Sequence, residues 1–126
     1  GRAAADAVME ATKGYDADRF NVAIAYGGRQ DIIEAVKSIA RDAKAGTLDP
    51  ESVGVATISG RLTTAGLPDP DVIIRTSGEE RISNFLLWQM AYAELYFADV
   101  YWPALTRLEF LRAIEEYQRR KRRYGA

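Results

Sequence analysis

Two short runs of continuous apolar residues stand out along the chain, and a glycine-rich or polar turn follows each of them. The runs cover residues 21–26 and 71–75. Neither run alternates apolar with polar side chains, so the pattern predicts strands covered on both faces, as in a parallel sheet. A shorter apolar run at residues 95–97 predicts a third strand.

Helical periodicity fills the stretches between these runs, with apolar positions recurring every three or four residues. Helices are predicted over residues 3–13, 29–45, 57–63 (a short one), 84–93 and from 106 to about 122. Gly46 is expected to end the second helix. Thr106 is expected to open the last one through a capping box with Glu109.

Strands that alternate with helices predict an α/β fold, with a mostly parallel central sheet flanked by helices. So few strands make a thin sheet with open edges. The chain also starts at Gly1 without a methionine or a signal peptide. We therefore expect residues 1–126 to be part of a larger single domain. The alternative is a small, complete α/β domain.

Composition removes several classes of site. The 126 residues include 17 Lys and Arg against 18 Asp and Glu, with no Cys and no His. Disulfides, thiolate or histidine metal sites and a Ser-His-Asp triad within this chain are therefore excluded. A net charge of −1 gives no overall field to attract nucleic acid, so no nucleic-acid partner is expected. No apolar run approaches the roughly 18 residues of a membrane span.

The candidate chemistry follows the second apolar run, where ligands of open parallel sheets bind. Arg75 ends the predicted strand, and Arg81 and Ser83 lie on the turn after it. Guanidinium groups and hydroxyls suit phosphate oxygens, which predicts a phosphate or diphosphate site. The alternative is a solvated polar loop in which Glu79 or Glu80 pairs with the arginines.

Two further positions carry possible ligands. The turn Gly27-Gly28-Arg29 leads from a predicted strand into a helix, so its N–H groups could bind an anion; the alternative is a tight turn that needs glycine. Glu94 follows a strongly apolar stretch. Its carboxylate is either a ligand for Mg²⁺, which typically combines one or two carboxylates with phosphate oxygens, or an ion-pair partner of an arginine.

At these residues the chain resembles the cis-prenyltransferases, the (Z)-isoprenyl diphosphate synthases. Residues 71–94 resemble the signature D-x-x-I-R-T-S-G-E-x-R-x-S-N-F-L-x-W-Q-x-x-Y-x-E, and residues 21–29 resemble N-x-x-x-x-Y-G-G-R. Residues 102–103 and the R-x-G ending at 123–125 also fit. The resemblance covers essentially the whole chain and corresponds to the C-terminal half of the family's domain.

The resemblance implies an enzyme that adds isopentenyl diphosphate to an allylic diphosphate with Mg²⁺, forming a cis double bond. The residues that it implies for binding isopentenyl diphosphate are Arg75, Arg81, Ile82 and Ser83. It places Glu94 at a magnesium position. It implies a homodimer in which Arg123 and Gly125 reach the diphosphate of the other subunit. No residue of this half is identified as catalytic.

The chain departs from the family pattern in two places. The N-terminal signature H-x-x-M-D-G-N-x-R-W is absent, so the chain alone is expected to be inactive and to require the N-terminal half of the domain. Glu80 stands where many relatives have His. Two alternatives stay open, a non-catalytic subunit of a heteromeric prenyltransferase and an irregular prenyl-coupling relative. The resemblance implies a cytoplasmic location, at the membrane surface when products are long.

Overall fold

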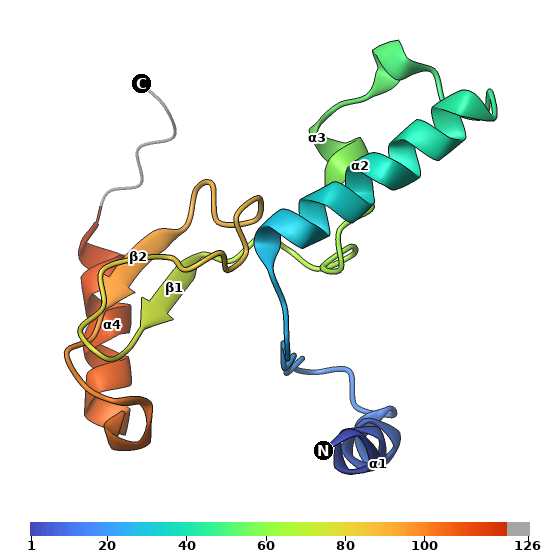
Figure 1. Ribbon diagram of the computed structural model, residues 1–126. Helices are drawn as coiled ribbons and strands as arrows, with labels where there is room; N and C mark the ends of the chain where they lie inside the picture. Colours follow the sequence, from blue (N-terminus) through green and yellow to red (C-terminus); the bar gives the residue numbers. More distant parts are fainter. Residues whose placement is uncertain (121–126) are drawn as a thin grey trace.

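The computed structural model describes residues 1–120. Its longer elements are helices α1 (Arg2–Thr12), α2 (Gly28–Lys44), α3 (Val55–Ser59) and α4 (Arg107–Arg119) and strands β1 (Val72–Arg75) and β2 (Glu94–Phe97). Two single 3₁₀ turns, Pro50–Ser52 and Trp102–Ala104, join them. Figure 1 shows the two strands beside α4, the α2 and α3 pair at the other side, and α1 apart from both.

The sheet of the described residues is a parallel pair, which confirms the predicted α/β class with a parallel sheet and helices. Val72 lies opposite Glu94, and Arg75 lies opposite Phe97. Helix α4 packs against β2 (Figure 1). The residues of β1 are half-buried rather than covered on both faces, because within residues 1–120 the sheet has two strands and β1 has β2 alone beside it.

The ends of α2 and α4 follow from local sequence. Gly46 adopts a φ of +74°, its N–H donates to the Ala43 carbonyl at 3.1 Å, and the Thr47 N–H donates to Asp42 at 3.0 Å. This is the glycine-terminated C-cap that the sequence predicts. At the start of α4, the Thr106 hydroxyl accepts from the Glu109 N–H at 3.3 Å, as expected for an N-cap.

Two predicted elements are wrong in this structure. Residues 21–26 form no strand, and Val22 and Ile24 are 67% and 80% exposed, because no strand of the described chain pairs with them. Residues 84–93 form a series of turns instead of a helix. Asn84 and Leu86 have φ values of +62° and +46°, outside the right-handed helical region.

The buried core of the described residues is small. Its apolar members are Ala35, Leu62, Ala98 and Ala113. Large apolar side chains such as Phe20, Tyr101 and Trp102 are between 69% and 92% exposed. Much apolar surface is therefore uncovered. Over residues 1–120, no helix has the length and apolar character needed to cross a bilayer.

Candidate functional site

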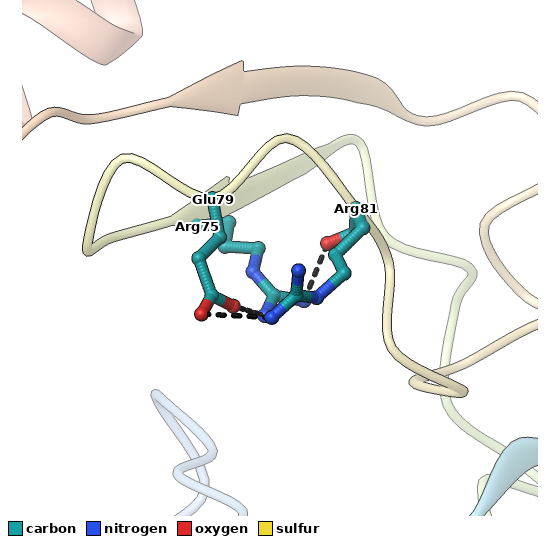
Figure 2. A network of polar contacts seen from close by, with 3 residues as sticks. All are labelled: Arg75, Glu79 and Arg81. Carbon is teal, nitrogen blue, oxygen red and sulfur yellow. Dashed lines mark hydrogen bonds and ion pairs between the residues drawn. The ribbon is translucent and has the colours of Figure 1, made fainter.

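Arg75, Glu79 and Arg81 form one cluster at the carboxyl end of β1 (Figure 2). The Arg75 guanidinium pairs with Glu79 and also donates to the Arg81 carbonyl. The Arg81 guanidinium reaches the other Glu79 oxygen at 2.9 Å. The structure therefore brings the two predicted arginines together, with Glu79 between them as the alternative interpretation of this loop expected.

The two arginines differ in how firmly they are held. The Arg75 side chain is 24% exposed, because it leaves the strand end and folds back under the loop, whereas the Arg81 side chain is 69% exposed. The loop is anchored to the chain after β2, since the Ser77 N–H donates to the Val100 carbonyl at 2.7 Å and the Gly78 N–H to Ala98 at 3.2 Å. These bonds fix the place where Arg75 meets its partners.

Gly78 is required where it stands. Its φ is +63°, and a Cβ there would lie 2.7 Å from the Asp99 carboxylate. Any other residue would strain the backbone and push Asp99 away. The glycine of the signature thus lets the loop close tightly over the end of the sheet.

An apolar cavity of about 180 Å³ opens beside the arginine cluster. Arg75, Arg81 and Ser83 of the predicted site are among the residues that line it. Its apolar walls are Ile73, Ile74, Ile82, Phe85, Met90, Leu95 and Phe97. The cavity suits a small hydrocarbon group, and the adjacent arginine cluster suits the anionic head of the same ligand.

The glycine turn before α2 is already occupied by protein groups. The Gly28 N–H donates to the Asn84 carbonyl at 2.7 Å, and the Arg29 N–H donates to the Asn84 side-chain oxygen at 2.9 Å. Gly27 has an extended backbone that any residue adopts. The glycines serve close packing, because a Cβ on Gly28 would lie 2.8 Å from Leu87 Cγ. Anion binding at Gly27, Gly28 and Arg29 remains a prediction.

Glu94 lies at the opposite end of the sheet from Arg75. Glu94 pairs with Val72, three residues before Arg75 in β1. At 3.3 Å per residue, Glu94 and Arg75 are about 10 Å apart along the strand direction. The Glu94 carboxylate accepts from Arg120 Nη1 at 3.2 Å, and the same guanidinium group donates to the Leu95 carbonyl at 2.9 Å. The hydrogen bond to Glu94 raises the pKa of Arg120. The structure thus shows the ion pair that was the alternative to a metal site.

Among residues 1–120, no group of three or more acidic, His or Cys side chains gathers where it could hold a metal ion. The remaining predicted contacts, Arg123 and Gly125, lie outside the described residues.

Comparison with known proteins decides the family. The family model described as "Putative undecaprenyl diphosphate synthase" matches residues 2–125. This chain belongs to that family. The family resemblance predicted from the sequence is thereby confirmed.

Relatives in this prenyltransferase family are similar over most of the chain. A tritrans,polycis-undecaprenyl-diphosphate synthase (geranylgeranyl-diphosphate specific) of Methanopyrus kandleri is 60% identical over 91% of the chain. The protein of the same name from Methanocaldococcus jannaschii is 58% identical over 92%. Isoprenyl transferase 1 of Corynebacterium diphtheriae is 55% identical over 83%. The chain covers only 41–42% of these three relatives.

A solved prenyltransferase structure has the same fold. Lavandulyl diphosphate synthase from Lavandula x intermedia, in complex with dimethylallyl diphosphate, superimposes with a TM-score of 0.93 at 35% identity. A probable undecaprenyl diphosphate synthase from Campylobacter jejuni gives a TM-score of 0.74 at 38% identity. The chain matches the C-terminal region of these larger chains and covers 54% and 56% of them.

The chain also contains a buried polar network that we did not predict. Asp31 is 7% exposed and accepts from the Tyr26 hydroxyl at 2.9 Å, the Thr63 N–H at 2.9 Å and Gln89 Nε2 at 3.4 Å. Gln89, 4% exposed, also donates to the Thr64 hydroxyl at 3.0 Å. Burial is the larger cause and the hydrogen bond to Asp31 the smaller one of a raised pKa at Tyr26. The only sequence signal was an acidic residue in the first turn of a helix.

Proposed function

We propose that the protein containing this chain transfers an allylic prenyl group to isopentenyl diphosphate and forms a cis double bond. The proposal rests on the family, on relatives named as polyprenyl diphosphate synthases, and on the arginine cluster. Because the chain spans less than half of the curated relatives, the activity is proposed for the complete protein.

The observation that supports this most directly is the arrangement of Arg75 and Arg81 around one carboxylate. Two guanidinium groups that converge on Glu79 from different backbone positions form a site for an anion with several oxygens. A diphosphate carries more charge and more acceptor oxygens than Glu79, so it competes for the same donors. The adjoining apolar cavity suits a five-carbon isopentenyl group.

In this proposal Arg75, Arg81 and Ser83 bind the diphosphate of isopentenyl diphosphate. Arg75 acts as the fixed anchor, because its side chain is held under the loop, and exposed Arg81 closes over the ligand. Ile82 contributes to the cavity wall. Binding in this way orients the double bond toward the allylic carbon and lowers the entropic part of the barrier.

We propose Mg²⁺ as the cofactor, with Glu94 as one ligand. A single carboxylate fits a magnesium ion that takes its other ligands from phosphates, water and residues elsewhere in the domain. When bound, the ion would neutralise charge on the departing diphosphate. Within this chain, Arg120 has to release the Glu94 carboxylate before that oxygen is free for a cation.

We also propose that residues 1–126 are the C-terminal half of one domain and that the enzyme is a homodimer. The exposed apolar run at residues 21–26 and the small core leave surface for the remainder of the domain to cover. In the dimer, Arg123 and Gly125 would contact the diphosphate bound by the other subunit.

A second candidate is irregular coupling of prenyl units. It is favoured by the TM-score of 0.93 to lavandulyl diphosphate synthase, although the identity to that protein is only 35%. Elongation is the better supported reaction, since relatives named as polyprenyl synthases are 48–60% identical.

The test is product analysis with the complete protein. Labelled isopentenyl diphosphate is supplied with Mg²⁺ and with geranylgeranyl, farnesyl or dimethylallyl diphosphate in separate reactions. We expect elongated products whose added units are cis, with geranylgeranyl diphosphate accepted. Branched or cyclic products from dimethylallyl diphosphate alone would favour irregular coupling, and no product with any allylic substrate would refute prenyl transfer.

A further inference from the structure

The chain segment that follows the arginine cluster has a strained backbone. Ser83, Asn84 and Leu86 all adopt positive φ values, of +46°, +62° and +46°. Residues with a Cβ rarely adopt this region, and such conformations persist only where surrounding contacts fix them. The contacts that fix residues 83–86 therefore also determine where Ser83 and Arg81 stand.

Asn84 makes those contacts with the first turn of α2. Its carbonyl accepts from the Gly28 N–H at 2.7 Å and its side-chain oxygen accepts from the Arg29 N–H at 2.9 Å. Gly27 provides no side-chain cap of its own. Asn84, 55 positions away from Arg29, thus satisfies two N–H groups that a helix start leaves without partners.

The receiving helix end is itself rigidly placed. Asp31, in the same first turn, is hydrogen-bonded to Tyr26, Thr63 and Gln89. The absence of a Cβ on Gly28 allows the Asn84 backbone and Leu87 to approach closely. Helix α2 therefore offers a fixed point to which the loop is attached.

We propose that Asn84 is a positioning residue for isopentenyl diphosphate, one that acts through Arg81 and Ser83 rather than on the ligand. The loop is held at two points. Arg75 binds the Arg81 carbonyl at one end, and the α2 terminus binds Asn84 at the other. Arg81 and Ser83, which both line the cavity, lie on the stretch of chain between these points. This inference rests on the proposed function of those two residues.

The test compares three variants of the complete enzyme. Asn84→Gly tolerates the positive φ but removes the side-chain acceptor. Asn84→Asp keeps an acceptor oxygen, which is favourable at a helix N-terminus. Ser59→Ala is the matched control, because it removes one hydrogen-bond acceptor, that of the Trp88 Nε1–H (2.9 Å), and leaves both bonds from Asn84 to α2 in place.

We expect Asn84→Gly to raise the KM for isopentenyl diphosphate roughly five- to tenfold. Losing one helix-cap bond lowers the fraction of molecules in which the loop has its binding conformation, and the KM rises by the same factor. The KM for the allylic diphosphate should stay within about twofold of wild type by the same argument. Asn84→Asp should restore most of the loss. Ser59→Ala should lower the melting temperature without changing either KM.

An unchanged KM for isopentenyl diphosphate in Asn84→Gly, or an equal rise for both substrates, overturns the proposal and leaves Asn84 a stabilising residue only. If Asn84→Gly does not fold, Asn84→Ser takes its place, because its shorter side chain cannot reach the Arg29 N–H. A second readout is the rise in melting temperature on adding inorganic diphosphate, which should be smaller in the acceptor-deleted variant. Inactive wild-type enzyme would refute the proposed function instead.

Discussion

Residues 21–26 and residues 72–75 have similar apolar sequences but different structures. The second segment forms β1, pairs with β2 and is half-buried. The first forms no strand, and its Ile24 is 80% exposed. The difference lies in the availability of a partner strand, because the backbone groups of a strand need a neighbour to receive their hydrogen bonds. An apolar run therefore indicates the capacity to join a sheet, and the rest of the fold decides whether it does.

The largest expected difference concerns activity with and without the remainder of the domain. We expect residues 1–126 alone to show no prenyl transfer. Residues 21–26 pair with no strand among residues 1–120, and the N-terminal signature with its Asp is absent. The complete protein should be active in the same assay. The measurement is incorporation of labelled isopentenyl diphosphate, with circular dichroism as the control for folding. Magnesium-dependent transfer by residues 1–126 alone would contradict the prediction.

A pair of substitutions in the complete protein tests whether the two apolar segments become equivalent there. Ile74→Asp places a carboxylate in a paired strand and should cost several kcal/mol, on the order of 3 or more. Ile24→Asp should cost about as much if residues 21–26 join the sheet. The measurement is the free energy of unfolding by chemical denaturation. An Ile24→Asp effect within about 0.5 kcal/mol, typical of surface positions, would show that this segment stays exposed.

At the carboxyl end of β1, we expect Arg75→Ala in the complete enzyme to raise the KM for isopentenyl diphosphate about 10- to 150-fold. That range corresponds to roughly 1.5–3 kcal/mol for a charge-assisted hydrogen bond. Arg75→Lys should fall between wild type and Arg75→Ala, because lysine keeps the charge and loses the planar fork. Steady-state kinetics at saturating allylic diphosphate measures the effect. An unaltered KM would make the loop a solvated turn.

The smallest effect is expected where residues 21–26 meet α2. Tyr26→Phe removes the hydrogen bond to Asp31 and should cost about 0.5–1.5 kcal/mol. Burial and that bond raise the folded-state pKa of Tyr26 above its ordinary value of 10.0. The contribution of Tyr26 to the free energy of unfolding is therefore complete below pH 10. It is lost as the pH rises through the higher pKa that Tyr26 has in the folded state. Unfolding measured from pH 8 to 11 should show a shallower decline for Tyr26→Phe than for wild type.

Elements stabilised by neighbours in sequence were predictable. Gly46 ends α2 and Thr106 opens α4 through bonds that span a few residues, and the pairs Glu115–Arg119 (2.5 Å) and Glu116–Arg120 (3.3 Å) form as i,i+4 spacing predicts. The arginine cluster could be predicted equally well, since its three members lie within seven positions of the chain.

Features that depend on distant residues were not predictable. The spacing of Phe85, Trp88 and Tyr92 fits a helix, but Asn84 bonds to the start of α2 and draws the chain into turns. Asp31 and Gln89 are 58 positions apart, so nothing in either segment indicates that they meet. An ion pair between Glu94 and an arginine was one of the two alternatives predicted. Only the fold shows that the arginine is Arg120.

The attachment of Asn84 to α2 also bears on the order in which the protein folds. The hydrogen bonds that hold helices α2 and α4 join residues that are close in sequence. These bonds form early, because they cost little chain entropy. The bond between Arg29 and Asn84 closes a loop of 55 positions, and its entropic cost is met only once both ends are nearly in place. The turn that carries Arg81 and Ser83 therefore belongs to the last events of folding. A refolding chain should regain its helical signal before it regains affinity for diphosphate.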